Sequence, residues 1–367
     1  MDHENTYPYD NEGYSALDIP TTAALRYVMD IAALTNRGAA EDLDGDEVSP
    51  DAARTQLVID AGCDLPSTWL AKHNVAVVPI HIKMGDERLR DDGNEADRMA
   101  FVGRLSGRIP PLRISPARPV QIRDYLQTWM TPQIDNVVQL TFAATGSSVY
   151  LSSLAASQSL MLIHNKVRRS LGSSGPLRAW VIDSFTGLAG TGVLLSHAVQ
   201  LRDAGMPAND IATTLETFRR QVRTLLVPDD VRFLYRSLQV EGTQRVGAGL
   251  PRWKLWLARL FDLKPILVID RGSGGMLLRM RGFDAACDRA LSITSRHIAL
   301  GLSTPTVCIS VAGPLDFLRT LPAFTELAAV CKRQRIDMIV TPMSMTGCVK
   351  LGPRAISVAF ASERFHG

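Results

Sequence analysis

Small hydroxyl residues in two predicted loops are the side chains best placed to bind a ligand. Ser115 lies in a polar loop that spans residues 113–119 and connects two predicted helices. Thr145, Gly146 and Ser147 follow an apolar stretch that ends at Phe142. Ligands of open parallel sheets bind beyond the carboxyl ends of the strands, so hydroxyls there can donate hydrogen bonds to one. Ordinary turn and helix-cap chemistry explains the same residues equally well.

A glycine-rich stretch, residues 187–192, follows Asp183 and Ser184 at the end of a predicted strand. A helix that starts in such a loop can hold a phosphate with its free N–H groups. The dinucleotide pattern, however, needs another glycine order, and the Gly-Lys-Ser/Thr of the Walker motif is absent. The pattern therefore favours glycines that let a strand and a helix pack closely.

Neither a catalytic centre nor a metal site is predicted. The seven histidines form no His-Glu-x-x-His motif, and the five cysteines form no Cys-x-x-Cys. Ser184 has no identifiable base, and Gly-x-Ser-x-Gly is absent. We therefore expect no catalytic residue, no metal and no cofactor.

A helical apolar stripe lies between residues 252 and 261, and basic residues lie off the stripe. This pattern favours a buried amphipathic helix. A tunnel lid or a transient contact with a membrane surface is the alternative, since tryptophan with basic residues suits an anionic interface. The stripe consists of Trp253, Trp256, Leu257, Leu260 and Phe261.

The composition is that of an ordinary globular protein. A net charge of +3 on 367 residues, without a basic-aromatic signature, argues against nucleic-acid binding. Residues 1–18 are polar and acidic, unlike a signal peptide. The odd, widely spaced cysteines suit reduced thiols in the cytosol, so we expect a cytoplasmic protein.

Alternating short strands and helices predict an α/β domain at residues 55–205. Its parallel sheet would be covered by helices on both faces. We expect strands at 56–60, 75–80, 136–142 and 178–182, and helices at 97–105, 120–129, 152–170 and 188–204.

An α+β domain with a mixed sheet is predicted at residues 206–367. We expect helices at 210–224, 284–300 and 315–333, a hairpin of strands 264–270 and 276–281, and strands at 305–311, 337–341 and 355–360. Residues 1–54 are predicted to be an N-terminal extension with a disordered tail, one helix at 20–36 and an acidic linker.

Five segments, in order, resemble the DegV family of bacterial fatty-acid-binding proteins, also called fatty-acid-kinase binding subunits. The resemblance spans roughly residues 55–361. The segments are Val58–Pro66, Val77–Ile80, Val181–Gly192, Lys264–Leu267 and Leu351–Ile356.

The resemblance implies a two-domain fold with a ligand tunnel between the domains. One long-chain fatty acid would lie in the tunnel, its carboxylate held by hydroxyls and by a histidine near the C-terminus. A partner kinase catalytic subunit would phosphorylate the carboxyl to an acyl-phosphate, and the binding subunit would have no catalytic machinery of its own.

The motifs that hold the carboxylate differ from the family pattern. The family's Thr-Ser-Gln-Pro stands here as Ile114-Ser115-Pro116-Ala117, its Ser-Gly-Thr as Thr145-Gly146-Ser147, and its His-x-Gly-Pro-Gly as Lys350-Leu351-Gly352-Pro353-Arg354. Lysine can still pair with a carboxylate as a point charge. The resemblance thus assigns the carboxylate to Ser115, Thr145, Gly146, Ser147 and Lys350. The candidates for the tunnel or its lid are Ile114 and, from the helical stripe, Trp253, Trp256, Leu257 and Leu260.

The predicted function is therefore fatty-acid binding and presentation to a kinase. A divergent regulatory or interaction protein that binds no fatty acid is one alternative. A cleft enzyme, either an acyl or a phosphoryl transferase, is another.

Overall fold

The computed structural model describes residues 54–105, 111–130, 133–170, 175–240 and 262–365. The helix predicted at 20–36 and the apolar stripe at 252–261 lie outside these residues. Within the described part, no helix combines the length and apolar character needed to cross a membrane.

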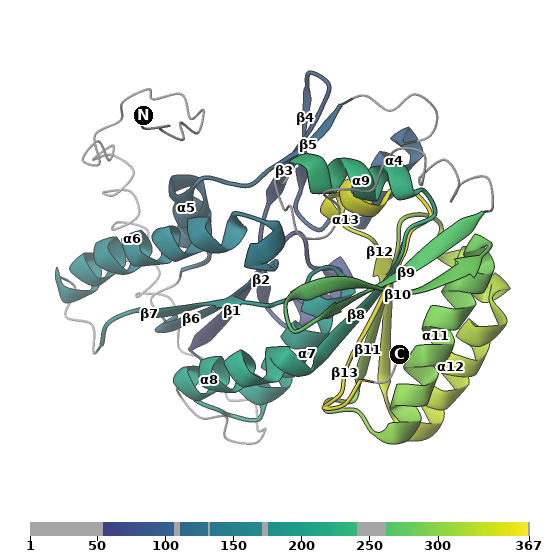
Figure 1. Cartoon of the computed structure of the whole chain (residues 1–367). Coiled ribbons are helices and arrows are strands. Elements are labelled where there is room, and N and C mark those ends of the chain that lie inside the picture. Colours follow the sequence, from purple (N-terminus) through teal and green to yellow (C-terminus); the bar gives the residue numbers. More distant parts are fainter. Residues whose placement is uncertain (1–53, 106–110, 131–132, 171–174, 241–261, 366–367) are drawn as a thin grey trace, which may run out of the picture. The chain divides into compact units, whose positions relative to one another are not determined.

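Four parallel strands form the first sheet, in the order β2-β1-β6-β7 (Figure 1). Every residue of β1 is buried, as expected for a central strand of a sheet covered on both faces. The strands are β1 (Thr55–Asp60), β2 (Val75–Val78), β6 (Asn136–Thr141) and β7 (Arg178–Asp183).

Helices cover both faces of this sheet, as predicted (Figure 1). Helices α5 (Pro119–Trp129) and α6 (Val149–Ser170) pack on the face that carries Val58 and Val137. Helices α7 (Ala189–Asp203) and α8 (Ala208–Phe218) pack on the face that carries Leu57 and Ile59. Two further helices, α3 (Ser67–Lys72) and α4 (Glu95–Arg104), belong to the same part of the chain.

A small antiparallel sheet, in the order β4-β3-β5, was not predicted. Its strands are β3 (Ile80–Met84), β4 (Glu87–Asp91) and β5 (Leu112–Ser115). The strand predicted at 75–80 is confirmed only as far as Val78, because Pro79, which lacks an N–H donor, separates β2 from β3. The loop predicted at 113–119 is also wrong in its first residues, which pair with β3.

The C-terminal part contains a mixed six-stranded sheet, in the order β10-β9-β8-β13-β11-β12. Strands β11 and β12 are parallel, and the other neighbours are antiparallel. The strands are β8 (Val222–Val227), β9 (Leu263–Asp270), β10 (Ser273–Arg281), β11 (Thr306–Val311), β12 (Asp337–Pro342) and β13 (Ile356–Ala361).

The helix predicted at 210–224 is too long. Helix α8 ends at Phe218, a 3₁₀ turn covers Arg219–Gln221, and β8 begins at Val222. Val222 extends the helical spacing of Ile211, Leu215 and Phe218, so periodicity alone could not separate the two elements. The predicted hairpin is confirmed, although its turn consists only of Arg271 and Gly272, both with positive φ.

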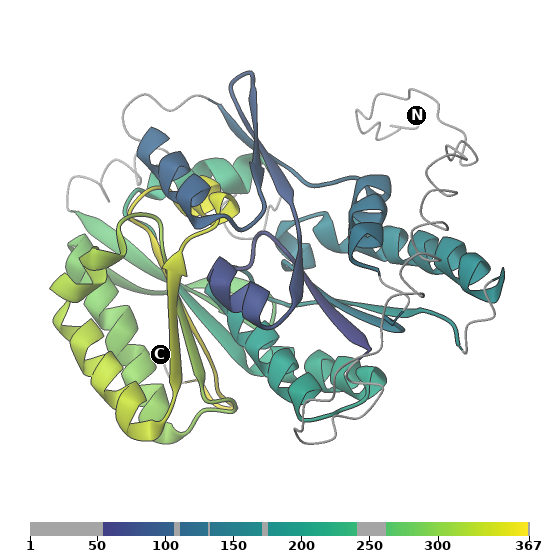
Figure 2. The same ribbon diagram turned by 180° about the vertical axis from the view of Figure 1, so that it is seen from behind.

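Helices α11 (Phe283–Leu300) and α12 (Pro322–Gln334) cover one face of the mixed sheet (Figure 2). Helix α7 packs on the other face, against β8, β11 and β13. Smaller elements are the 3₁₀ turns η1 (Ala144–Gly146) and η3 (Leu315–Thr320) and two helices that were not predicted, α9 (Val231–Val240) and α13 (Met345–Leu351).

The predicted fold class is confirmed: a parallel sheet in the N-terminal part is followed by a mixed sheet in the C-terminal part. The domain boundary between residues 205 and 206 and the ligand tunnel stay predictions.

Candidate functional site

The loops after β1 and β6 are joined by the buried carboxylate of Asp60. It accepts hydrogen bonds from the backbone N–H of Phe142 at 2.6 Å and of Gly62 at 2.8 Å. Burial raises the pKa of Asp60 to about 6, although these two hydrogen bonds act in the opposite direction. Asp60 thereby fixes the backbone just before the Thr145 loop.

The ring of Phe142 fills the space that glycines leave in the neighbouring loops. A Cβ atom on Gly187 would lie 2.2 Å from this ring, and one on Gly62 would lie 2.9 Å from it. A Cβ on Gly190 would lie 2.1 Å from the hydroxyl of Thr224 on β8. The interpretation of residues 187–192 as close-packing glycines is thus confirmed.

Ser184 serves the turn in which it lies. It is fully buried, its hydroxyl donates to the carbonyl of Thr186 at 2.9 Å, and it accepts from the N–H of Thr186 at 3.2 Å. These bonds occupy the hydroxyl within a local turn.

The Thr145-Gly146-Ser147 loop lies at the carboxyl end of β6 and touches the mixed sheet. The exposed Thr145 donates from Oγ1 to the carbonyl of Gly272, in the β9–β10 turn, at 3.4 Å. The hydroxyl of Ser147 accepts from the N–H of Val149, at the start of α6, at 3.2 Å. The loop therefore lies where the two sheets meet.

Lys350 lies in the last turn of α13 and faces the ring of Phe142. Its Nζ is 5.2 Å from the centroid of the Phe142 ring, a cation–π distance. Lys350 is half-buried, and Phe142 precedes Thr145 by three residues. The structure thus brings a cation to the side chain of Phe142, and its approach to the predicted hydroxyls stays a prediction.

Ser115 and Ile114 end β5, against which α13 packs. Ile114 is half-buried and packs on the hydrophobic cluster that contains Phe142 and Leu351. Ser115 is exposed and lines a surface cavity of about 440 Å³. Helix α13 therefore contacts β5 and, through Lys350, the ring of Phe142, whereas the convergence of Ser115, Thr145 and Ser147 on one ligand stays a prediction.

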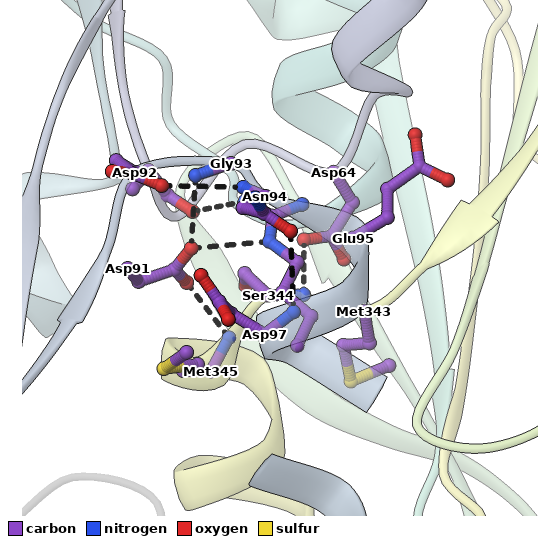
Figure 3. A network of polar contacts seen from close by, with 12 residues as sticks. Asp64, Asp91, Asp92, Gly93, Asn94, Glu95, Asp97, Met343, Ser344 and Met345 are labelled. Carbon is purple, nitrogen blue, oxygen red and sulfur yellow. Dashed lines mark hydrogen bonds and ion pairs between the residues drawn. The ribbon is translucent and has the colours of Figure 1, made fainter. Parts of the chain in front are cut away.

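Helix α13 is held in place by a buried ionic network that the sequence analysis missed (Figure 3). Arg98 on α4 is 1% exposed and lies 3.1 Å from Asp91, whose other oxygen accepts from the N–H of Met345 at 2.8 Å. Asp64 accepts from the N–H of Ser344 at 2.9 Å. Burial raises the pKa of Asp64, and the charge of Arg98 opposes that rise.

The cysteine thiols and the side chains that could ligate a metal are the remaining groups with chemistry of their own among the described residues. All five cysteines are buried and free. Burial raises the pKa of each thiol, which makes the thiolate scarce at neutral pH. The described ranges contain no group of three or more His, Cys, Asp or Glu residues that could hold a metal ion. Trp253, Trp256, Leu257 and Leu260 lie outside those ranges.

Solved structures of several other proteins have the same α/β fold. A lipid-binding DegV protein from Thermotoga maritima has a TM-score of 0.65 at 16% identity, covering 85% of this chain and 100% of that one. A fatty-acid-binding DegV protein from Bacillus subtilis also has a TM-score of 0.65 at 16% identity, covering 84% and 99%. The fatty acid kinase (Fak) B3 protein from Streptococcus pneumoniae, loaded with linoleic acid, has a TM-score of 0.60 at 14% identity, covering 84% and 99%.

Sequence comparison gives the family. A family model described as "Uncharacterised protein, DegV family" matches residues 54–363. A DegV domain-containing protein of Xanthomonas axonopodis pv. citri is 30% identical over 312 residues, which cover 84% of this chain and 98% of that one. The chain belongs to the DegV family.

Proposed function

We propose that this protein binds a long-chain fatty acid in a tunnel between its two domains and presents the carboxylate to a kinase catalytic subunit for acyl-phosphate formation. Family membership supports the proposal, as do the fatty acids named for the structural relatives. The Fak B3 relative supports the kinase partnership in particular.

The observation that carries the proposal is the position of Lys350. Its ammonium group lies beside Phe142, just before the Thr145-Gly146-Ser147 loop. A carboxylate that leaves water must be paired or hydrogen-bonded, or its burial costs several kcal/mol. A lysine together with the hydroxyls of Thr145 and Ser147 would meet that need.

The apolar tail would supply most of the affinity. About 14 buried methylenes at about 0.8 kcal/mol each contribute on the order of 11 kcal/mol, and association costs offset a substantial part. Ile114 is the tunnel-lining candidate within the described residues. Residues 252–261 stay the predicted lid or transient membrane contact.

We infer that the protein is a non-catalytic cytoplasmic binding subunit whose ligand is the fatty acid itself. The hydroxyl of Ser184 is occupied by its own turn, and the cysteine thiols are buried. A serine or cysteine nucleophile needs an adjacent base or a lowered pKa, and these side chains lack such an environment.

Native mass spectrometry of freshly purified protein tests the binding. We expect a bound mass that matches a C16 to C18 acid and disappears on denaturation. A ligand-free spectrum, together with no heat in a palmitate titration, would rule the function out. The kinase step is tested separately, as ATP-dependent formation of acyl-phosphate when the catalytic subunit is added.

A further inference from the structure

The outward face of the β3–β5 sheet consists mainly of basic residues. Along β3, Ile80, Ile82 and Met84 are buried, so His81 and Lys83 point to the other face. The strand register adds the outward residues of the neighbours. Arg88 and Arg113 lie opposite Lys83, and Arg90 and Ser115 lie opposite His81. We call these six residues the basic face.

The cations of this face lie directly opposite one another. Arg88, Lys83 and Arg113 form one cross-strand row, and like charges in such a row destabilise a sheet. None of the three forms an ion pair with a residue that the structure describes. Two of the nearby carboxylates pair with cations outside this face: Glu87 with Arg104, and Asp91 with Arg98. Asp92 lies 3.5 Å from Arg90, and Asp86 lies in the exposed β3–β4 turn.

The basic face borders the cavity of about 440 Å³. Its volume falls in the range of roughly 300–1,000 Å³ that is typical of small-molecule sites. Arg118, which precedes α5, adds a cation from a second element. The cavity is lined by His81, Ile82, Lys83, Arg88, Ser115, Pro116, Arg118 and Gln121.

We propose that this cavity binds the di- or triphosphate group of a small molecule. Two guanidinium groups can each hold phosphate oxygens with paired hydrogen bonds, and Lys83 adds a point charge. A monocarboxylate would neutralise only one of these three cations, whereas a diphosphate carries enough charge for all of them. The proposal rests on the basic face and its cavity and stands without fatty-acid binding.

Isothermal titration of the full-length protein with inorganic pyrophosphate tests the proposal. We expect saturable binding that weakens as ionic strength rises. The double variant Lys83→Gln/Arg88→Gln should bind at least roughly 10-fold more weakly, because each charge-assisted contact is worth about that factor. Arg279→Gln/Arg281→Gln, on the exposed edge strand β10, is the matched control and should bind like wild type.

A second pair of variants separates a pocket from diffuse charge. Arg118 lines the cavity, whereas Arg113 belongs to the basic face but is not among the lining residues. Arg118→Gln should therefore weaken pyrophosphate binding more than Arg113→Gln does. If the two substitutions weaken pyrophosphate binding equally, the proposal that the anion binds in the cavity is wrong.

The remaining outcomes are equally decisive. Absence of pyrophosphate binding at low salt would overturn the proposal. Binding of poly-glutamate without pyrophosphate would instead assign the basic face to an acidic protein partner. Palmitate titrations of the same variants show whether fatty-acid binding stands or fails independently.

Discussion

At the residue scale, the charge chemistry of position 350 distinguishes this chain from the family pattern. A lysine ammonium stays charged through neutral pH, whereas an imidazole titrates there. Lys350 is held beside Phe142 by a helix whose first turn is anchored in the core. A carboxylate bound here would thus meet a lysine in place of the histidine of the family pattern.

Lys350→Met should weaken palmitate binding about 10-fold to 150-fold, the loss expected for one charge-assisted contact. Binding of the matching alcohol should hardly change, because burial of its tail is the same. Affinity of the wild type should vary little between pH 6 and 8. Titration calorimetry checks all three, with the exposed Lys332→Met as control. Equal palmitate affinities of Lys350→Met and wild type would remove Lys350 from the site.

The buried Asp60 should make the folded state less stable as pH rises. The pKa of Asp60 in the folded state, about 6, lies above the ordinary value of 3.8. The contribution of Asp60 to the free energy of unfolding is therefore complete below about pH 3.8 and is lost as pH rises through 6. This rise in pKa corresponds to about 3 kcal/mol. Urea unfolding of wild type and Asp60→Asn between pH 4 and 7 measures the difference. If the free energy of unfolding changes with pH in the same way for the two proteins, the raised pKa of Asp60 is wrong.

At the element scale, short elements and distant pairs limited what the sequence could predict. The run Leu57-Val58-Ile59 predicted a buried parallel strand correctly, and the hydroxyl loop was placed correctly at the end of β6. Strand β5 has only four residues, of which every second one is polar. Asp91 and Met345 are 254 positions apart, so no local pattern could reveal the contact that anchors α13.

Loss of Arg98 should destabilise the fold strongly. Arg98→Met leaves the carboxylates of Asp91 and Asp64 buried without their cation, a change that costs about 3–5 kcal/mol. The control is Arg104→Met on the same helix, whose ion pair with Glu87 is exposed and should matter little. Urea denaturation compares the two. Similar midpoints would show that the network contributes no more than a surface pair.

Gly187→Ala should disturb the loop that carries the predicted hydroxyls. The new methyl group would have to displace the Phe142 ring, and such overpacking costs about 1–3 kcal/mol. Gly103→Ala is the control, because its methyl group would meet no atom within 4 Å. The melting temperature and the palmitate affinity should both fall for Gly187→Ala, and neither should fall for Gly103→Ala. A wild-type melting temperature for Gly187→Ala would contradict the packing described for Phe142.

At the scale of the whole molecule, α7 belongs to the cores of both sheets. Its apolar residues share one hydrophobic cluster with Leu57 and Ile59 of the parallel sheet and with Leu226 and Ala359 of the mixed sheet. A Cβ on Gly192 would lie 3.1 Å from the carbonyl of Asp64 and 3.2 Å from the sulfur of Cys308. Separating the sheets would expose this helix to water.

We therefore expect that residues 55–205 and 206–367 do not fold as separate fragments. Each would expose one side of a core that the intact chain buries, at about 25 cal/mol per Å² of apolar surface. Near-ultraviolet circular dichroism and urea unfolding of the purified fragments provide the check, with the intact chain as reference. Cooperative unfolding of either fragment would show that its core is self-sufficient.

The five buried cysteines can report how the cores of this protein open. Cys63, Cys308 and Cys348 lie in the core shared by the sheets, and Cys287 and Cys331 lie in the core beneath α11 and α12. A thiol reagent reaches a cysteine only when the core around it opens. The alkylation rate of each cysteine therefore measures how often its own surroundings open. Peptide-resolved alkylation could thus show, without any engineered label, which core yields first when a ligand enters.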